Sequence, residues 1–323
     1  MKYKPILIIG GEPNSIFLEI LIKSLKIKRF KSPIILIVSL EIFKMQLKKL
    51  KLNYPFKVVD EFSLKEMNLN NKYLNIIDVK YNTKKVFDKI SSKSNRYIHK
   101  CFDLALRLMS YGLTDKFING PISKKFFLKN RYQGITEYLS KKFNISDNFA
   151  MIIYDKKISV SPITTHLPID KVKKNLTTKR IVAKTLLVNN FYKKTLLKSP
   201  KIAICGLNPH CENFFIKHSE EKKIIEPAIK ILKKKVFIRG PFPADTIFLE
   251  NNRKKFDIII GMYHDQVLAP IKTISEFSSV NITIGLPFLR LSPDHGPNYK
   301  MVGKNKSNPQ SLLNSIKFLD KIN

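Results

Sequence analysis

The chain has 323 residues, of which 44% are hydrophobic, so it can bury a large core in one or two domains. Its formal net charge is +34, but only eight of its 59 basic residues are Arg, and the Lys residues are spread along the whole chain. Nucleic-acid-binding surfaces more often cluster their charge and combine Arg with aromatic residues. We therefore do not expect nucleic acid as the main partner, although a Lys-rich nucleic-acid-binding protein stays an alternative.

Cysteine usage and hydropathy indicate the compartment. The three cysteines form no C-x-x-C pair, which is typical of reduced thiols in a cytosolic protein. No run approaches the roughly 20 apolar residues that a membrane-spanning helix needs. We expect a soluble, cytoplasmic protein without a membrane partner.

Short apolar runs alternate with helical patterns along most of the chain, and this alternation predicts an α/β fold with βαβ units and a largely parallel sheet. The predicted strands are Ile6–Ile9, Ile34–Val38, Leu74–Val79, Lys116–Ile118, Ala150–Tyr154, Lys157–Ile163, Ile202–Cys205, Val236–Ile238, Asp257–Ile260 and Val280–Ile284. The predicted helices include Phe17–Ile27, Ile42–Leu50, Val86–Ser110, Arg180–Tyr192 and Glu220–Lys233.

A dinucleotide site of the Rossmann type is not predicted. Gly10 and Gly11 follow the first strand, but the sequence Gly-Gly-Glu-Pro is not G-x-G-x-x-G. The acidic residue that should follow about 20 positions later is also missing.

Polar residues gather where apolar runs end, which is where α/β proteins bind ligands. His166, His210 and His264 each follow a predicted strand. They are too far apart in the sequence for a local metal motif, so only the fold could bring them together. Taken one at a time, each could equally be a hydrogen-bonded loop histidine; together they indicate a metal site.

Two basic residues suit an anionic substrate. Arg290 offers a bidentate fork and Lys272 a point charge for carboxylate or phosphate, although either could be surface charge. The turn from Ser292 to Pro297 is rich in hydrogen-bonding groups and could hold a nucleotide or cap a helix.

Six short motifs occur in a fixed order: Thr164–His166, Cys205–His210, Gly240–Thr246, Tyr263–Gln266, Asn281–Pro287 and Asp294–Gly296. In order and spacing they resemble the 4-hydroxythreonine-4-phosphate dehydrogenases of the vitamin B6 pathway. The resemblance covers essentially the whole chain. It implies a two-domain α/β/α fold like that of isocitrate and isopropylmalate dehydrogenases, with the active site in the interdomain cleft. The first domain would comprise 1–125 and 283–323, and the second 126–282.

The resemblance also implies roles for individual residues. The divalent metal ligands would be His166, His210 and His264, with His264 supplied by the neighbouring subunit of a homodimer. The substrate-binding positions would be Thr136, Lys272, Asn281 and Arg290, and the catalytic ones Lys272, Asp245 and Asp265. The segment from Asp294 to Asn308 would bind NAD or NADP without a Rossmann fold, through Asp294, His295, Gly296, Asn305 and Asn308. Zn, Mg, Mn and Co all suit three imidazoles plus substrate oxygens.

The implied reaction is NAD-dependent oxidation of 4-phosphooxy-L-threonine to 2-amino-3-oxo-4-phosphooxybutanoate, followed by decarboxylation to 3-amino-2-oxopropyl phosphate. Two departures from the family keep a related substrate open, such as threonate or erythronate 4-phosphate. Ile135 replaces a histidine of the family's Gly-His-Thr-Glu motif, and the glycine-rich turn at Gly11–Glu19 has lost glycines. Pro297 and Asn298 also replace the last two residues of Asp-His-Gly-Thr-Ala.

Overall fold

The structure is a computed structural model that describes residues 3–64, 66–128, 131–132, 134–145, 148–211 and 219–322. Two compact units divide the chain, Met1–Ile135 with Pro287–Asn323, and Thr136–Leu286. The sequence-based boundaries fall at 125/126 and 282/283, ten and four residues earlier than these. Among the described residues, no helix is both long and apolar enough to cross a membrane.

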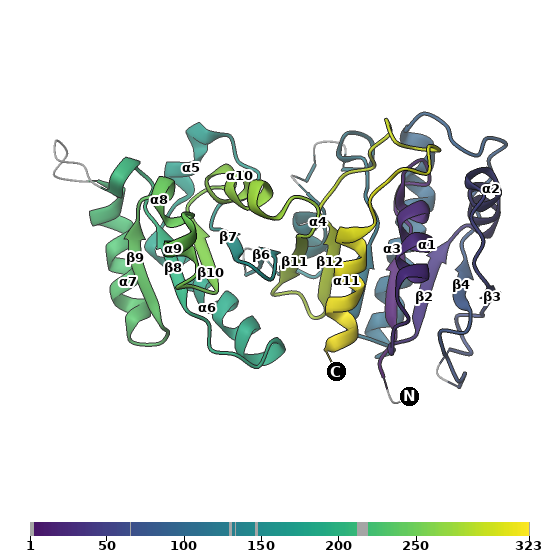
Figure 1. The fold of residues 1–323 in the computed structure, drawn as a ribbon, viewed down its shortest axis with the longest axis horizontal. Helices are drawn as coiled ribbons and strands as arrows, with labels where there is room; N and C mark the ends of the chain where they lie inside the picture. The colour runs from purple at the N-terminus through teal and green to yellow at the C-terminus, as the bar shows by residue number, and fades with distance from the viewer. Residues whose placement is uncertain are drawn as a thin grey trace. The chain divides into compact units, whose positions relative to one another are not determined.

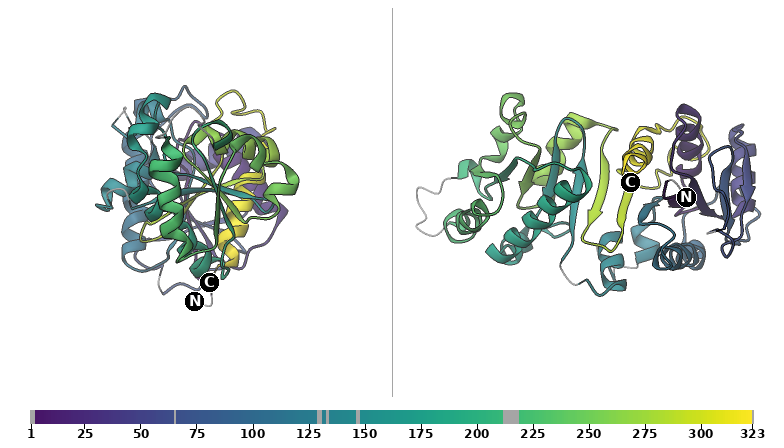
Figure 2. Two further views of the ribbon diagram at one scale, coloured as in Figure 1. Left: turned by 90° about the vertical axis from the view of Figure 1, so that its left-hand side faces the viewer. Right: turned by 90° about the horizontal axis from the view of Figure 1, so that it is seen from below.

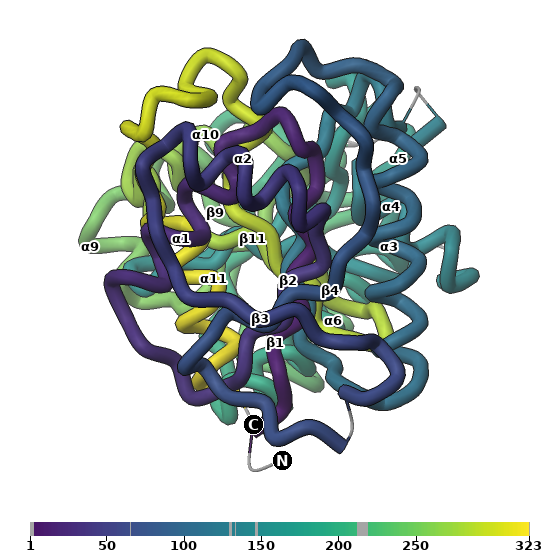
Figure 3. Tube along the Cα trace, turned by 90° about the vertical axis from the view of Figure 1, so that its right-hand side faces the viewer, coloured from purple at the N-terminus to yellow at the C-terminus, as the bar shows by residue number. Residues whose placement is uncertain are grey.

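The first unit contains a parallel sheet in the order β3-β4-β2-β1-β5-β12. Its strands are β1 (Ile6–Ile9), β2 (Ile34–Val38), β3 (Phe56–Val58), β4 (Leu74–Asp78), β5 (Lys116–Asn119) and β12 (Leu289–Pro293). Its α-helices are α1 (Phe17–Ile27), α2 (Leu40–Leu50), α3 (Asn95–Ser110) and α11 (Gln310–Lys321). Figure 3 shows α1 and α11 on one side of these strands and α3 on the other. The sheet is therefore covered on both faces, which explains its continuously apolar strands.

The second unit has the strand order β11-β6-β7-β10-β8-β9. Its strands, labelled in Figure 1, are β6 (Ala150–Tyr154), β7 (Ser159–Pro162), β8 (Ile202–Cys205), β9 (Ile238–Phe242), β10 (Ile258–Gly261) and β11 (Val280–Ile284). Its α-helices are α4 (Ile135–Lys142), α5 (Ile169–Asn175), α6 (Thr178–Thr195), α7 (Glu226–Lys233), α8 (Ala244–Ile247), α9 (Glu250–Arg253) and α10 (His264–Ser275). Helices flank this sheet as well (Figure 2, left).

The core of the second unit lies under three neighbouring strands. Val160 on β7, Ala203 on β8 and Ile259 on β10 are fully buried and belong to one apolar cluster. Val267 and Ile271 of α10 pack into the same cluster. The helix that begins at His264 is therefore anchored directly on the strands whose ends carry the candidate ligands.

The predicted α/β class and largely parallel sheet are confirmed; only the pairs of β6 with β7 and β11 are antiparallel among the described strand pairs. Two strands, β3 and β12, were not predicted. The predicted strand at Val236–Ile238 begins only at Ile238 and runs on to Phe242.

The predicted helix at Val86–Ser110 was wrong in its first part. The α-helix begins at Asn95 and is preceded by a short 3-10 turn, Ser92–Ser94. Serines at this point compete for backbone hydrogen bonds, as Ser91 does when its hydroxyl accepts from the Lys93 amide. Apolar residues at helical spacing continue on both sides of these serines, but the helix does not begin before them.

Candidate active site

Three neighbouring parallel strands of the second unit end in loops that each carry one histidine. β10 lies between β7 and β8 and pairs in parallel with both. His166 follows β7, His264 follows β10 and His210 follows β8. Because the carboxyl ends of parallel strands meet at one edge of the sheet, the fold directs all three loops to the same edge.

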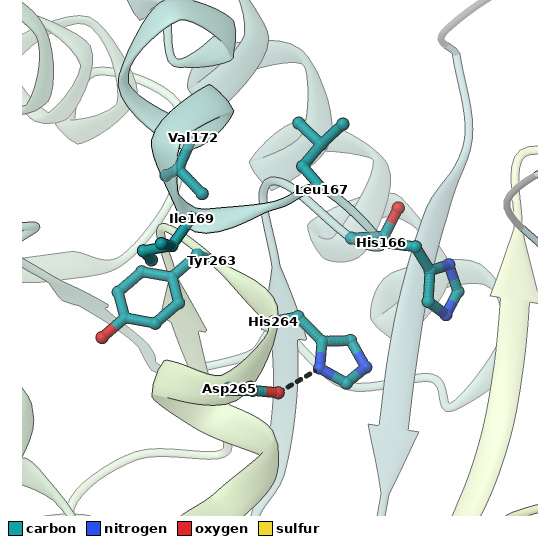
Figure 4. Close-up of a pocket in the computed structure, with 8 residues that line it drawn as sticks. His166, Leu167, Ile169, Val172, Tyr263, His264 and Asp265 are labelled. Carbon is teal, nitrogen blue, oxygen red and sulfur yellow. Dashed lines mark hydrogen bonds and ion pairs between the residues drawn. The ribbon is translucent and has the colours of Figure 1, made fainter.

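His166 and His264 lie against each other within one chain. Their ring centroids are 5.5 Å apart and their planes meet at 39°. Both rings border one side of a pocket of about 190 Å³, as Figure 4 shows, and apolar side chains form much of its other side. The pocket is lined by Thr165, His166, Leu167, Ile169, Val172, Tyr263, His264 and Asp265.

Each of the three histidines has a carboxylate near its Nδ1 atom. The Nδ1 of His264 lies 2.6 Å from Oδ1 of Asp265, and that of His166 lies 3.6 Å from Oε1 of Glu137. The Nδ1 of His210 lies 3.9 Å from Oδ2 of Asp245. A carboxylate hydrogen-bonded to one ring nitrogen fixes the tautomer and leaves Nε2 as the basic, metal-binding atom, and among these three pairs only Asp265 and His264 are at hydrogen-bond distance. Asp245 and Asp265 thus contact the histidines in this structure.

Sequence analysis missed Glu137, although it directly follows Thr136 in the segment that resembles the family's Gly-His-Thr-Glu. Its Oε1 also accepts a hydrogen bond from Thr165 Oγ1 at 3.1 Å. Burial raises the pKa of this carboxyl, but His166, the Glu137 backbone N–H and the Thr165 hydroxyl outweigh burial and hold the pKa below its ordinary value. Glu137 is therefore an anion beside His166 at neutral pH.

His210 is presented differently. Its side chain is 74% exposed, and its φ of 57° and the φ of 56° at Cys211 are left-handed values that non-glycine residues rarely adopt. Within the described ranges, no group of three or more His, Cys, Asp and Glu side chains is arranged to hold a metal ion. One chain therefore brings His166 and His264 together but does not complete a three-donor site with His210.

The donor set fits a divalent transition metal. His166 and His264 are paired imidazoles whose Nδ1 atoms face carboxylates. The Nδ1 of His166 is buried and, among the described residues, lacks a hydrogen-bond partner at normal length. Imidazoles supported in this way suit Zn²⁺ and its neighbours in the first transition row.

Three candidate substrate residues belong to the second unit. Thr136, at the start of α4, is buried, with its Oγ1 3.1 Å from Oγ1 of Thr283. Asn281 on β11 has a buried Oδ1 that finds no hydrogen-bond partner among the described residues. Lys272 is half-buried on α10, the helix that begins with His264. A buried amide oxygen without a donor among the described residues, such as that of Asn281, can accept a hydrogen bond from a bound substrate.

Arg290 belongs to the first unit. It lies on β12 and is only 4% exposed. Its Nε donates to Oδ1 of Asn119 on the neighbouring strand β5 at 2.6 Å. The interpretation of Arg290 as simple surface charge is therefore wrong.

The candidate cofactor segment, Asp294 to Asn308, is held by hydrogen bonds within itself and to neighbouring residues. The Asp294 amide donates to Ser311 Oγ at 2.9 Å, and His295 Nδ1 lies 2.9 Å from the carbonyl oxygen of Gly296. Asn305 Nδ2 donates to the Leu50 carbonyl at 3.1 Å. Asn308 Oδ1 accepts from the Gln310 amide at 2.9 Å, at the start of α11. Asn305 and Asn308 thus shape the segment, whereas Gly296 is exposed with open space where a Cβ would lie.

The altered turn near the N-terminus is held by a buried carboxylate. Glu12 accepts from the Asn14 amide at 3.2 Å and from Ser94 Oγ at 3.0 Å. Burial raises the pKa of Glu12, which these hydrogen bonds offset only in part. Gly11 keeps a φ of 70°, and a Cβ there would meet the Pro121 carbonyl oxygen at 2.5 Å, so one essential glycine of the turn remains.

A sheet whose parallel strands end in loops of polar side chains is typical of an α/β enzyme. Comparison with known proteins gives the family. The profile of the pyridoxal phosphate biosynthetic protein PdxA matches residues 29–319, so the chain belongs to the PdxA family, whose relatives are dehydrogenases. The resemblance found in the sequence is thereby confirmed.

Three similar proteins illustrate this. A 4-hydroxythreonine-4-phosphate dehydrogenase of Sulfurihydrogenibium sp. is 41% identical over 206 residues, an alignment that spans 62% of this chain and 63% of that relative. The D-threonate 4-phosphate dehydrogenase of Salmonella typhimurium is 29% identical, with 98% of both chains aligned. A solved 4-hydroxythreonine-4-phosphate dehydrogenase from Klebsiella pneumoniae has a TM-score of 0.83 at 27% identity, with 98% of each chain covered.

Proposed function

We propose that this chain is an NAD-dependent, divalent-metal-dependent dehydrogenase. It oxidises 4-phosphooxy-L-threonine to 2-amino-3-oxo-4-phosphooxybutanoate, which then loses CO₂ to give 3-amino-2-oxopropyl phosphate. The observation that carries the proposal is the His166–His264 pair at the carboxyl ends of adjacent parallel strands, with a carboxylate near each Nδ1. The dehydrogenase names of full-length relatives support it.

The residues of the chain have separable tasks in this proposal. His166, His210 and His264 would hold a divalent cation, which when bound supplies Lewis-acid polarisation of the substrate hydroxyl. Asp265, 2.6 Å from Nδ1 of His264, would keep the proton of that ring on Nδ1, so that Nε2 stays a donor atom. We therefore propose that Asp265 positions His264 and does not contact the reacting atoms. Glu137 and Asp245 lie farther from the Nδ1 atoms of His166 and His210 and would supply negative charge beside these rings.

The anionic ends of the substrate need cationic and amide partners. Arg290, whose Nε is fixed by Asn119, offers a pre-oriented guanidinium to a phosphate or carboxylate. The remaining candidates, Lys272, Thr136 and Asn281, supply an ammonium, a hydroxyl and an amide. Fixing both ends of a small substrate in this way orients the carbon that must lose hydride. We place the nicotinamide cofactor at the Asp294–Asn308 segment.

We further propose that the enzyme is a homodimer with a shared site. One chain pairs His166 with His264, and its described residues offer no third donor at that point. The resemblance assigned His264 to the neighbouring subunit, and that assignment stays a prediction. Because His264 pairs with His166 within one chain, we propose that His210 of the partner subunit is the shared donor.

NAD reduction with 4-phosphooxy-threonine, with and without Zn²⁺, Mg²⁺ or Mn²⁺, tests the function. We expect turnover that chelation abolishes and added metal restores. His166→Gln should lose both bound metal and turnover. His99→Gln is the matched control, because His99 packs on Phe127 at a centroid distance of 4.4 Å in the first unit. Turnover that survives exhaustive chelation contradicts the proposal.

A second candidate substrate is D-threonate 4-phosphate, favoured by the Salmonella relative that aligns with 98% of this chain. It carries a hydroxyl where 4-phosphooxy-threonine carries an amino group. A direct comparison of kcat/KM on the two compounds decides between them.

A further inference from the structure

The loop that carries His210 has a backbone that its own residues do not favour. His210 and Cys211 both have left-handed φ values, 57° and 56°. Such a conformation persists only where the surroundings hold it, and it is found preferentially at functional sites. The contacts that hold this loop are therefore relevant to how His210 is presented.

The main contact is made by Glu221, a residue that is 1% exposed. Its Oε1 accepts the backbone amides of Leu207 and Asn208, both at 2.8 Å. Its Oε2 accepts Nδ2 of Asn208, also at 2.8 Å. One buried carboxylate thus receives three hydrogen bonds from the two residues that precede Pro209 and His210.

The neighbouring Glu220 connects this loop to the loop of His166. Its Oε2 accepts from Nδ2 of Asn208 at 3.0 Å, and its Oε1 lies 2.6 Å from Nζ of Lys173. Lys173 belongs to α5, the helix that begins three residues after His166. Asn208 is therefore bound by both carboxylates at once.

Three further hydrogen bonds connect the histidine loops. Gln266 Nε2 donates to the Gly206 carbonyl at 2.7 Å, while its Oε1 accepts from the Met262 amide at 2.7 Å. Thr164 Oγ1 donates to the Met262 carbonyl at 2.7 Å. Buried hydrogen bonds thus link the loop of His264 to those of His210 and His166, and the ion pair of Glu220 with exposed Lys173 links the other two loops.

We infer that Glu221 is a positioning residue for metal binding: it holds the strained loop in the one conformation that presents His210 to the cation. The inference rests on the proposed metal-dependent function. Glu221 does not itself contact the cation. Its removal should therefore weaken metal binding through His210 and leave the strand β8 in place.

Glu221→Gln is the sharpest variant. The glutamine can still accept from the backbone amides with its oxygen, but its NH₂ group would face the NH₂ of Asn208. Glu226→Gln is the matched control, because it removes a carboxylate on the following helix whose ion pair among the described residues is with exposed Lys222, at 2.8 Å. Asn208→Ala is a second variant, which removes the side-chain amide that donates to both Glu220 and Glu221. It tests the inference if Glu221→Gln does not fold.

Calorimetric titration with Zn²⁺ and with Mn²⁺ measures the effect without any turnover. We expect Glu221→Gln and Asn208→Ala to bind metal about 10- to 100-fold more weakly than the wild type, and Glu226→Gln to bind as the wild type does. Hydrogen exchange of the metal-free protein should show faster exchange at the Leu207 and Asn208 amides in Glu221→Gln. A merely structural role would lower the melting temperature and speed the exchange of these amides but leave the metal affinity unchanged.

The outcomes are distinguishable. If the wild type binds metal, His210→Ala loses it, and Glu221→Gln and Asn208→Ala bind like Glu226→Gln, the inference is overturned and the proposed function stands. If the wild type binds neither metal and His210→Ala changes nothing, the proposed function fails and the inference fails with it.

Discussion

Arg290 and Asn119 form a hydrogen bond between neighbouring strands: the guanidinium Nε on β12 donates to the amide oxygen on β5 at 2.6 Å. Both side chains are buried, Arg290 to 4% and Asn119 to 2% exposure. The amide therefore fixes the plane of the guanidinium. A pre-oriented guanidinium is a far more selective anion partner than a flexible ammonium.

Arg290→Lys should consequently weaken substrate binding. Loss of a charged hydrogen bond costs about 1.5–3 kcal/mol, which corresponds to a rise in KM of about 10- to 150-fold. Steady-state kinetics on the phosphorylated substrate measures it. Arg239→Lys, an exposed change on β9, is the control and should leave KM unchanged. An unchanged KM in Arg290→Lys would remove Arg290 from the substrate site.

Mixing inactive variants tests the shared site. If His166 and His264 act from one chain and His210 from the other, a heterodimer of His166→Ala and His210→Ala regains one complete site. His166→Ala mixed with His264→Ala should stay inactive, because neither subunit keeps the pair. Activity of each mixture, with subunit exchange confirmed by mass spectrometry, is the measurement. Recovery in the second mixture alone would make His264 the shared donor.

We predict that the ionised carboxylate of Glu220 makes a pH-dependent contribution to the free energy of unfolding. The Lys173 ammonium and, next, the Asn208 amide lower the pKa of Glu220 from 4.5 to about 2, against a smaller effect of burial. Because the folded-state pKa is depressed, this contribution is present above about pH 4.5 and is lost as the pH falls toward 2.

The measurement is chemical unfolding of the wild type and Glu220→Gln between pH 6 and pH 2. The wild type should be more stable at pH 6 by no more than about 1 kcal/mol, since Lys173 is exposed and solvent screens the pair. The difference should vanish near the acid end of the range. A difference that stays constant with pH would show that the carboxylate charge does not matter.

The sequence predicted the strand-end positions of the three histidines because apolar strands and the polar residues that follow them are local patterns. It did not predict β12, since the apolar run before Arg290 contains Gly285 and Pro287 and is typical of a loop. It also missed Glu137 and Glu221. Both carboxylates are buried by contacts with residues that are 28 and 14 positions away, such as Thr165 and Leu207, and a single sequence shows no sign of such contacts.

The resemblance to the family indicated Asp245 and Asp265 as catalytic residues. The 2.6 Å contact of Asp265 with Nδ1 of His264 favours a positioning role for Asp265, because a carboxylate hydrogen-bonded to Nδ1 acts through its histidine. The catalytic assignment of Asp245, which lies 3.9 Å from Nδ1 of His210, stays a prediction. Whether a carboxylate contacts the substrate or a metal-binding histidine depends on side-chain geometry. The spacing of apolar residues in the sequence does not predict that geometry.

Ile135 replaces a histidine that the family places before Thr136, and its side chain is 7% exposed at the start of α4. Two explanations make opposite predictions for Ile135→His. If the pocket simply lacks a contact, the imidazole restores a charged hydrogen bond and lowers KM by about 10-fold or more. If the pocket has been rebuilt around an apolar residue, the imidazole is buried among apolar neighbours and KM stays the same or rises.

We expect the second result, because Ile135 is buried and the turn at Gly11–Glu19, which has also lost family glycines, is held by its own hydrogen bonds through Glu12. Kinetics on 4-phosphooxy-threonine and D-threonate 4-phosphate measures the effect on both candidate substrates. Ile135→Val is the matched control: it keeps the site apolar, costs about 0.5–1.5 kcal/mol of stability, and should leave KM unchanged. A gain of tenfold or more in kcat/KM for Ile135→His on either substrate would show that the missing imidazole is a lost contact.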